Sequence, residues 1–230
     1  MPRTLLVLLT LALLAAPAAS LTLEGPPDLT EGDTWTRVAE FQQGQLTYEV
    51  TQNATFAGAE ELTLNGTAYQ ALRLETHTTM RGTGPNGTLA FSSVSNSTQW
   101  MRTSDHALLA SESSSTFQSP QGARTSNSST TYHAPCEVLQ WPMAVNDTWS
   151  VSCDATVTQN GQSRNITAHH DYRVIREETV EVPAGTFQAL VIENGTADED
   201  RREVQWFAPA ACGPAKVTTS AGGQTFELDL

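Results

Sequence analysis

The sequence predicts an all-β protein, built from duplicated antiparallel half-units that form one curved sheet, half-barrel or barrel with pseudo-twofold symmetry. Two segments, Leu62–Glu75 (LTLNGTAYQALRLE) and Val180–Glu193 (VEVPAGTFQALVIE), align without a gap. Each has two runs of strand-forming residues around a turn signal, Asn-Gly in the first and Pro-Ala-Gly in the second. Sustained 3.6-residue periodicity is nearly absent, whereas Thr, Val and aromatic residues with period-two alternation dominate.

Residues 1–20 have the pattern of a secretory signal peptide. An early Arg3 precedes an apolar run from Leu5 to Ala16, and small residues follow it. The run is too short for a membrane anchor, and no later stretch is apolar enough to span a bilayer. We therefore expect an exported protein, secreted or held at the extracellular cell surface, with no transmembrane segment.

Residues 21–32 form an N-terminal extension with an apolar start and a hinge at Pro26-Pro27. The segment Leu21–Leu23 either docks on its own sheet or complements an open sheet edge on the next subunit. The second arrangement predicts self-assembly through the N-terminal strand. Self-association or contact with other surface proteins is the partner class that this feature suggests.

The first β repeat is predicted over residues 33–118 and the second over residues 146–230. Both contain a tryptophan start, the hairpin, a Gln-Trp element and a polar final strand, in the same order. Four ordered matches indicate a duplication. Residues 119–145 are expected to be a linker or crossover, with an edge strand as the alternative. Each repeat offers about five strands, and a lone half would leave long open edges, so one compact domain is expected.

Eight of the nine asparagines open an Asn-x-Ser/Thr triplet, the acceptor for N-glycosylation. Chance placement would give roughly a quarter of that number if sites followed composition. We interpret the excess as dense N-glycosylation of a secreted protein; the alternative is a Thr-rich β-protein with many Asn-Gly-Thr loops. The eight residues are Asn53, Asn65, Asn86, Asn96, Asn127, Asn146, Asn165 and Asn194.

Three cysteines occur in a chain that is expected to reach an oxidising compartment. Cys136 and Cys153 are close in sequence, and a local disulfide between them is the first choice. Such a loop would contribute on the order of 3 kcal/mol, chiefly by restricting the unfolded chain. Cys212 is then the odd cysteine: it is buried, pairs with one of the others, or links to a second molecule.

Charge and motifs exclude several function classes. A net charge of -13 disfavours nucleic acid as a partner, because an acidic chain repels phosphate backbones. His169 and Asp171 share a strand face, but one pair is a weak metal signal, and the acidic run Asp198–Asp200 lacks a spaced calcium loop. No nucleophile elbow and no phosphate-binding glycine loop occurs. We therefore predict no catalytic residue, no metal and no cofactor.

One group of motifs recurs together in the second repeat: Val-Pro-Ala-Gly-Thr-Phe at Val182–Phe187, Trp-Phe-Ala-Pro at Trp206–Pro209, then Gly213 and Lys216. In these motifs the second repeat resembles a family of exported bacterial and archaeal β-proteins of unknown function. The resemblance covers residues 147–220, and the first repeat departs from it at its turn. It implies an exported β-barrel-like or half-barrel domain, and it supplies no catalytic residues.

These features predict a secreted, N-glycosylated, non-catalytic cell-surface β-protein with a structural or interaction role. The alternative is a carrier of a lipid or other hydrophobic ligand in a barrel cavity. A carrier needs small residues around an unfilled interior, whereas a structural protein fills that space with Leu, Val and Trp. An enzyme would need polar groups that converge on one pocket, and His169, Asp171 and Asp198 are its first candidates.

Overall fold

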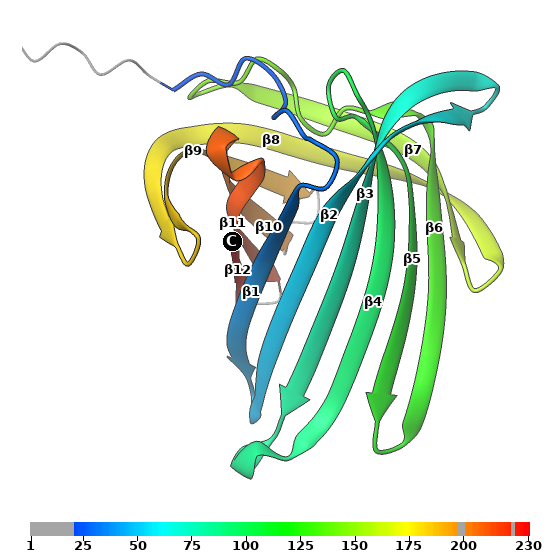
Figure 1. Ribbon diagram of the computed structural model, residues 1–230, viewed down its shortest axis with the longest axis vertical. Helices are drawn as coiled ribbons and strands as arrows, with labels where there is room; N and C mark the ends of the chain where they lie inside the picture. The colour runs from blue at the N-terminus through cyan, green and yellow to red at the C-terminus, as the bar shows by residue number, and fades with distance from the viewer. Residues whose placement is uncertain (1–20, 197–200, 222–223) are drawn as a thin grey trace, which may run out of the picture.

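A computed structural model describes residues 21–196, 201–221 and 224–230 of the chain, so the predicted signal peptide and the acidic run at 198–200 lie outside the described residues. Strands β1 to β12 form one closed antiparallel barrel in which sequence neighbours pair and β1 closes on β12 (Figure 1). The all-β fold is confirmed, and of the expected arrangements the chain adopts the barrel. The strands are β1 Thr34–Gln43, β2 Leu46–Leu64, β3 Thr67–Thr83, β4 Leu89–Arg102, β5 Leu108–Ser119, β6 Gly122–Cys136, β7 Thr148–Gln159, β8 Gln162–Val182, β9 Gly185–Thr196, β10 Arg201–Ala208, β11 Gly213–Ala221 and β12 Gln224–Asp229, with short 3-10 helices η1 Pro85–Gly87 and η2 Pro209–Ala211.

Both predicted hairpins are present. The first joins β2 to β3 through Asn65-Gly66, where φ is 50° and 82°, as a two-residue turn of the primed type requires. The second joins β8 to β9 through Pro183-Ala184. Its proline sets a negative φ, and the positive φ falls instead on Gly185, at 137°.

The stretch 119–145, which we expected to be a linker or crossover, contains β6. This strand pairs with β5 on one side and β7 on the other, so it is not an edge strand. Its sequence shows little hydrophobic alternation because both of its faces are polar. The barrel therefore has more strands than the roughly ten that periodicity indicated.

The loops before β1 and β7 are built alike. The Asp33 carboxylate accepts a hydrogen bond from the Thr30 amide at 2.7 Å, and the Asp147 carboxylate accepts one from the Ala144 amide at 2.7 Å. The amides of Gly32 and Asn146 bond to strands β2 and β8 in the same way. The shared geometry follows the sequence match between the two tryptophan starts. The duplication and its pseudo-twofold axis stay predictions.

The main hydrophobic core closes one end of the barrel, at the top in Figure 1, where the N-terminal segment crosses the strands. Leu23 is 4% exposed there and exchanges two backbone hydrogen bonds of 2.9 Å with Met143. The extension thus docks on its own chain, which is the first of the two arrangements expected for it. Self-assembly through the N-terminal strand stays a prediction. The buried residues of this upper core are Leu23, Met143, Tyr172, Val174, Leu190, Ile192 and Phe207.

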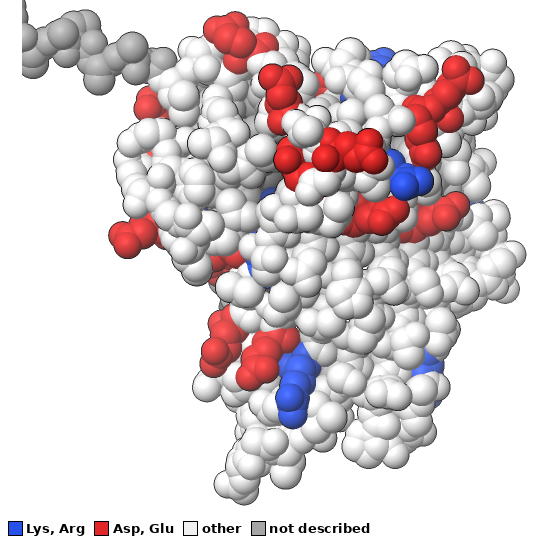
Figure 2. Space-filling model, in the orientation of Figure 1, with Lys and Arg blue, Asp and Glu red and all other residues white. Residues whose placement is uncertain are grey.

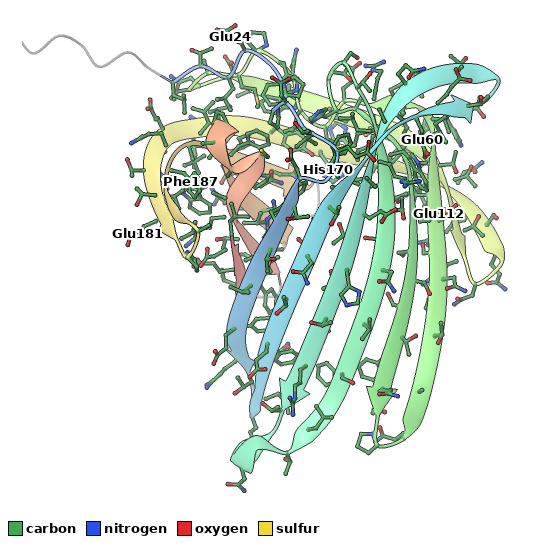
Figure 3. The ribbon with its side chains drawn as sticks, in the orientation of Figure 1. Glu24, Glu60, Glu112, His170, Glu181 and Phe187 are labelled. Carbon is green, nitrogen blue, oxygen red and sulfur yellow. A yellow bond between two sulfur atoms is a disulfide. The ribbon has the colours of Figure 1, made fainter. Side chains whose placement is uncertain are left out.

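Two smaller clusters lie beneath the bent ends of the long hairpins. The β2–β3 hairpin buries Leu64, Ala71 and Leu109, with Trp100 packed against them. The β8–β9 hairpin buries a larger set: Val180, Val182, Ala189, Ala208, Ala211 and Ala215, with Phe187 and Trp206 against them. Figure 3 shows Glu181 pointing outward from this hairpin, whereas Phe187 lies on its concave side. Trp100 and Trp206 are themselves half-buried.

The predicted disulfide is present and joins β6 to β7, with the Cα atoms of Cys136 and Cys153 5.5 Å apart. Cys212 is a free, half-buried thiol. Burial raises the pKa of this thiol, so it is a poor nucleophile at neutral pH. Across the residues that the structure describes, no helix is long and apolar enough to cross a membrane.

Candidate functional site

The inner face of the barrel can be followed from strand to strand through the registers. On β1 the alternation in burial turns Trp35, Arg37, Ala39 and Phe41 inward. Phe41 packs on both neighbouring strands, on Phe226 of β12 and on Tyr48 of β2. The inner face therefore continues across the β1–β12 closure.

Five inward aromatic rings form an aromatic band close to the hairpin turns at the lower end of the barrel. Successive ring centroids are 4.7, 4.8, 5.5 and 5.2 Å apart, which is the range of favourable ring contacts. Phe117, at one end of the band, is 40% exposed. In order, the band is Phe226, Phe41, Tyr48, Phe91 and Phe117.

Strand β3 contributes no ring to this band because its residue at that level is Gly82. A Cβ atom at this position would lie 2.2 Å from the ring of Phe91. The ring of Phe91 thus covers the glycine of the neighbouring strand, and only glycine leaves it that space.

Above the band the two sides of the interior differ chemically. The inward positions of β4, β5 and β6 form a serine wall of small hydroxyl side chains: Ser93, Ser95, Ser97, Ser113, Ser115, Ser126 and Ser128. On the other side, β1, β2, β3, β11 and β12 each present one apolar inward residue next to the level of the band, and these form an apolar wall: Ala39, Val50, Met80, Val217 and Leu228. The next inward residues on β2 and β3, Gln52 and Thr78, are polar. The interior is therefore amphipathic.

The space between the upper core and the aromatic band is not packed like a core. All residues of the serine wall are half-buried, and Ser115 donates its hydroxyl hydrogen bond to Ser95 at 2.9 Å. Among the described residues of β4 to β6, the fully buried ones, Leu109 and Cys136, lie near the upper end. Small side chains around an incompletely filled interior are the feature that a ligand carrier requires.

Arg37 brings a positive charge into this interior. Its guanidinium donates to the Gln52 carboxamide oxygen at 3.2 Å and to the Pro214 carbonyl oxygen at 3.0 Å. In residues 21–196, 201–221 and 224–230, nothing accepts a hydrogen bond from the Arg37 Nε or from the indole Nε1 of Trp35. Burial lowers the pKa of the Arg37 side chain, because desolvation disfavours the charged form.

A second polar group lies higher on the opposite wall. The register places Tyr172, Asn194 and Glu203 in one row across β8, β9 and β10. Burial raises the pKa of Tyr172 to about 12, with the Glu203 carboxylate adding to the shift. His170 lies two residues from Tyr172 on the same strand face, with 6.2 Å between the ring centroids. Within the described part of the chain, neither the His170 Nδ1 nor the Asn194 Oδ1 has a hydrogen-bond partner.

The closure between β1 and β12 is thin. These strands share one residue pair, Val38 with Asp229. A pocket of about 460 Å³ lies above that pair, and Trp35, Cys212 and Leu230 line it. We call it the seam pocket; it opens the region around Trp35 to the outside.

Seven of the eight predicted glycosylation sites have exposed side chains, and Asn194 is the exception. Asn53, Asn96 and Asn127 lie along one outward row, in which the registers alternate them with His77 and Ser114. Asn194 carries the same triplet, but its register turns it into the barrel. In Figure 2 acidic side chains gather over the upper half of the drawn face, while much of the lower half is uncharged.

The residues that sequence reasoning ranked first for chemistry are not brought into the interior. His169 and Asp171 do share a face, with 3.6 Å between Nε2 and Oδ1, but that face is exposed. Asp198 lies outside the described residues. Within the described part of the chain, no group of three His, Cys, Asp or Glu side chains is arranged to hold a metal ion.

The interior residues themselves were not predicted as a site. One signal was available: Arg37 is a lone charge in strand parity with Trp35 and Phe41, both large apolar residues. Comparison with known proteins adds no further assignment, since no family model, no curated protein and no solved structure matches the chain. The resemblance of the second repeat to exported β-proteins therefore stays a prediction.

Proposed function

We propose that this chain is an exported, N-glycosylated β-barrel protein that binds an amphiphilic small molecule in its interior, without a chemical step. The observation that carries the proposal is the space below the upper core, with its serine wall, its apolar wall and its aromatic band. Clefts that bind small molecules combine apolar and aromatic lining with a few placed polar groups, and this interior has that composition.

Three features support the expectation of export. Residues 1–20 have the pattern of a signal peptide, seven of the eight glycosylation triplets are exposed, and Cys136 and Cys153 form a disulfide. Disulfides of this kind persist in oxidising compartments outside the cytosol. The extracellular cell surface or the medium is the proposed location.

A structural or interaction role at the cell surface is the second candidate. It is favoured by the outward row of Asn53, Asn96 and Asn127, which would carry glycans over one face of the barrel. We propose glycosylation at the seven exposed triplets in either case. Nucleic acid is not proposed as a partner, because the chain carries a net charge of -13.

Native mass spectrometry of the protein from its own source separates the two candidates. A monomer with an adduct of lipid size, released by solvent extraction, supports the carrier. Protein that carries a series of glycan masses but no lipid adduct, as a monomer or as multiples of the subunit, supports the surface role and contradicts the carrier.

A matched pair of variants tests the location of the adduct. Ser95→Leu adds a large side chain to the serine wall and should remove the adduct. Ser114→Leu adds the same group to the outer face of β5, where Ser114 is exposed, and should retain the adduct. Loss in both variants, or in neither, would place the ligand elsewhere.

A further inference from the structure

Resting on the carrier proposal above, we propose that the interior ligand is a single-chain amphiphile with an anionic head group, a carboxylate or a phosphate. The head group binds at Arg37 and Trp35, and the chain runs along the apolar wall to the aromatic band. Four observations support this assignment: unpartnered donors, an unpaired charge, a continuous apolar track and a route of entry.

The unpartnered polar atoms on the inner face of β1 are both hydrogen-bond donors. The Nε of Arg37 and the indole Nε1 of Trp35 are buried, and neither has a hydrogen-bond partner among the residues that the structure describes. Neither group can accept a hydrogen bond. The two residues are two positions apart on one strand face, which is about 7 Å. A ligand whose head group offers only acceptor oxygens satisfies both donors.

The charge of Arg37 is also unpaired. Its two hydrogen-bond partners, the Gln52 side chain and the Pro214 carbonyl, are neutral, and no carboxylate of a described residue forms an ion pair with it. Arg73, Arg102 and Arg176, by contrast, each pair with a carboxylate. An uncompensated charge in a desolvated site is costly, so a bound anion would stabilise it.

An apolar track connects this charge to the aromatic band. Phe41 is four residues from Arg37 on the same strand face, about 14 Å along β1. Between these two levels the register places Ala39 beside Val50. The next strand adds Met80 opposite Val50. A chain of medium length therefore reaches from the head-group site to the aromatic rings.

The seam pocket gives the head group a route of entry. It is lined by Trp35 and lies beside the single residue pair that closes β1 on β12. Arg37 spans this closure through its bond to Pro214. If Arg37 served only to hold β1 against β11 across the seam, the affinity for a ligand would not depend on its head group.

The test compares ligands that share one chain and differ in the head group. Delipidated wild-type protein is titrated with dodecanoate, dodecyl phosphate, dodecanol and dodecylamine by calorimetry. A charged hydrogen-bonded contact implies that at least one of the two anionic probes binds about tenfold to a hundredfold tighter than dodecanol. Dodecylamine should bind more weakly than dodecanol. The stronger of the two anionic probes identifies the head group.

The variant Gln52→Glu supplies an internal counter-ion and leaves the hydrogen bond from Arg37 to Pro214 in place. The new carboxylate would accept the hydrogen bond from Arg37, neutralise it and compete with an anionic ligand. In this variant we expect the affinity for the anionic probe to lie within about twofold of the affinity for dodecanol, because the charged hydrogen bond from Arg37 to the head group would be lost. Thr51→Glu adds the same charge to the outer face of β2 and should leave the preference unchanged.

The outcomes distinguish the two proposals. If dodecanol and both anionic probes bind equally to wild-type protein, the anionic site is wrong and the carrier proposal stands. If the Gln52→Glu variant retains the preference, Arg37 is not the head-group site. If none of the four probes binds, the carrier proposal itself fails. The wild-type ratio needs no variant, so misfolding of a variant would not leave the question open.

Discussion

The two ends of the barrel differ in how they are packed. At the upper end Leu190 is 0% exposed and packs with Ile192 and Phe207 under the N-terminal segment. At the lower end Phe41, Tyr48 and Phe91 of the aromatic band are half-buried, and Phe117 is 40% exposed. The filled end stabilises the fold, and the proposed ligand site lies at the other end of the same barrel.

The same contrast holds for the covalent and charged groups. The disulfide joins β6 to β7 near the upper core, and the ion pairs of Arg102 with Asp105 and Glu137 lie at the same end. Arg37, below them, has only neutral partners. Substitutions at the upper end should therefore change mainly the stability of the fold, and substitutions at the lower end should change mainly the affinity for the proposed ligand.

The largest expected effect comes from a matched pair of leucines. Leu190→Ala removes a fully buried side chain from the upper core and should lower the free energy of unfolding by about 3 kcal/mol. Leu228→Ala removes the same atoms from the half-buried apolar wall and should cost only about 1 kcal/mol. Urea unfolding measures both. Equal losses would mean that the lower interior is packed as tightly as the upper.

Removal of the disulfide should have the next largest effect. Cys136 and Cys153 are 17 residues apart, and loop-closure entropy predicts a loss of about 3 kcal/mol for the double serine variant. Binding of dodecanol to the folded variant should be unchanged, because the bridge is remote from the aromatic band. If the folded variant bound dodecanol more weakly than wild type, the idea that the upper end sets stability and the lower end sets binding would be wrong.

Alkaline pH should weaken the upper end through Tyr172. Its pKa is raised to about 12 in the fold, while an unfolded tyrosine ionises near about 10. The folded state therefore holds the proton more tightly, so this contribution is fully present below about pH 10 and is lost as pH rises through 12. The full loss, reached above pH 12, amounts to about 3 kcal/mol.

The variant Tyr172→Phe isolates that contribution, because the other tyrosines remain. The difference in unfolding free energy between wild type and Tyr172→Phe should be constant up to about pH 10 and should shrink above it. Absorbance of the phenolate in the folded protein reports the pKa directly. A phenolate that forms near the ordinary value would refute the burial of this hydroxyl.

The smallest expected change in stability is at Gly82. Gly82→Ala would bring a Cβ atom to 2.2 Å from the ring of Phe91, so the ring must move away. Overpacking at a half-open site should cost about 1 kcal/mol. The near-ultraviolet circular dichroism of the aromatic band should change and dodecanol should bind more weakly. Gly25→Ala, in the N-terminal extension, has open space around its Cβ position and no positive φ, so it is the control for binding.

Local patterns carried much of the fold. The turn pair Asn65-Gly66, the strand runs on either side of it and the proximity of Cys136 to Cys153 all depend on neighbours in sequence, so they could be predicted. Strand β6 was harder to predict because hydrophobic alternation marks a strand only when one face is buried, and β6 has serines on its inner face.

Only the closed barrel decides which side chains point into the interior. Which face of each strand points inward depends on the register between strands, and a shift of one residue would exchange the faces. Asn194 and Asn165 each open an Asn-x-Thr triplet, yet of the two only Asn194 is turned inward, beside Tyr172. Arg37 is likewise an ordinary charged residue in the sequence. It becomes a candidate head-group site only because β1 closes on β12 and places it in a desolvated interior without a counter-ion.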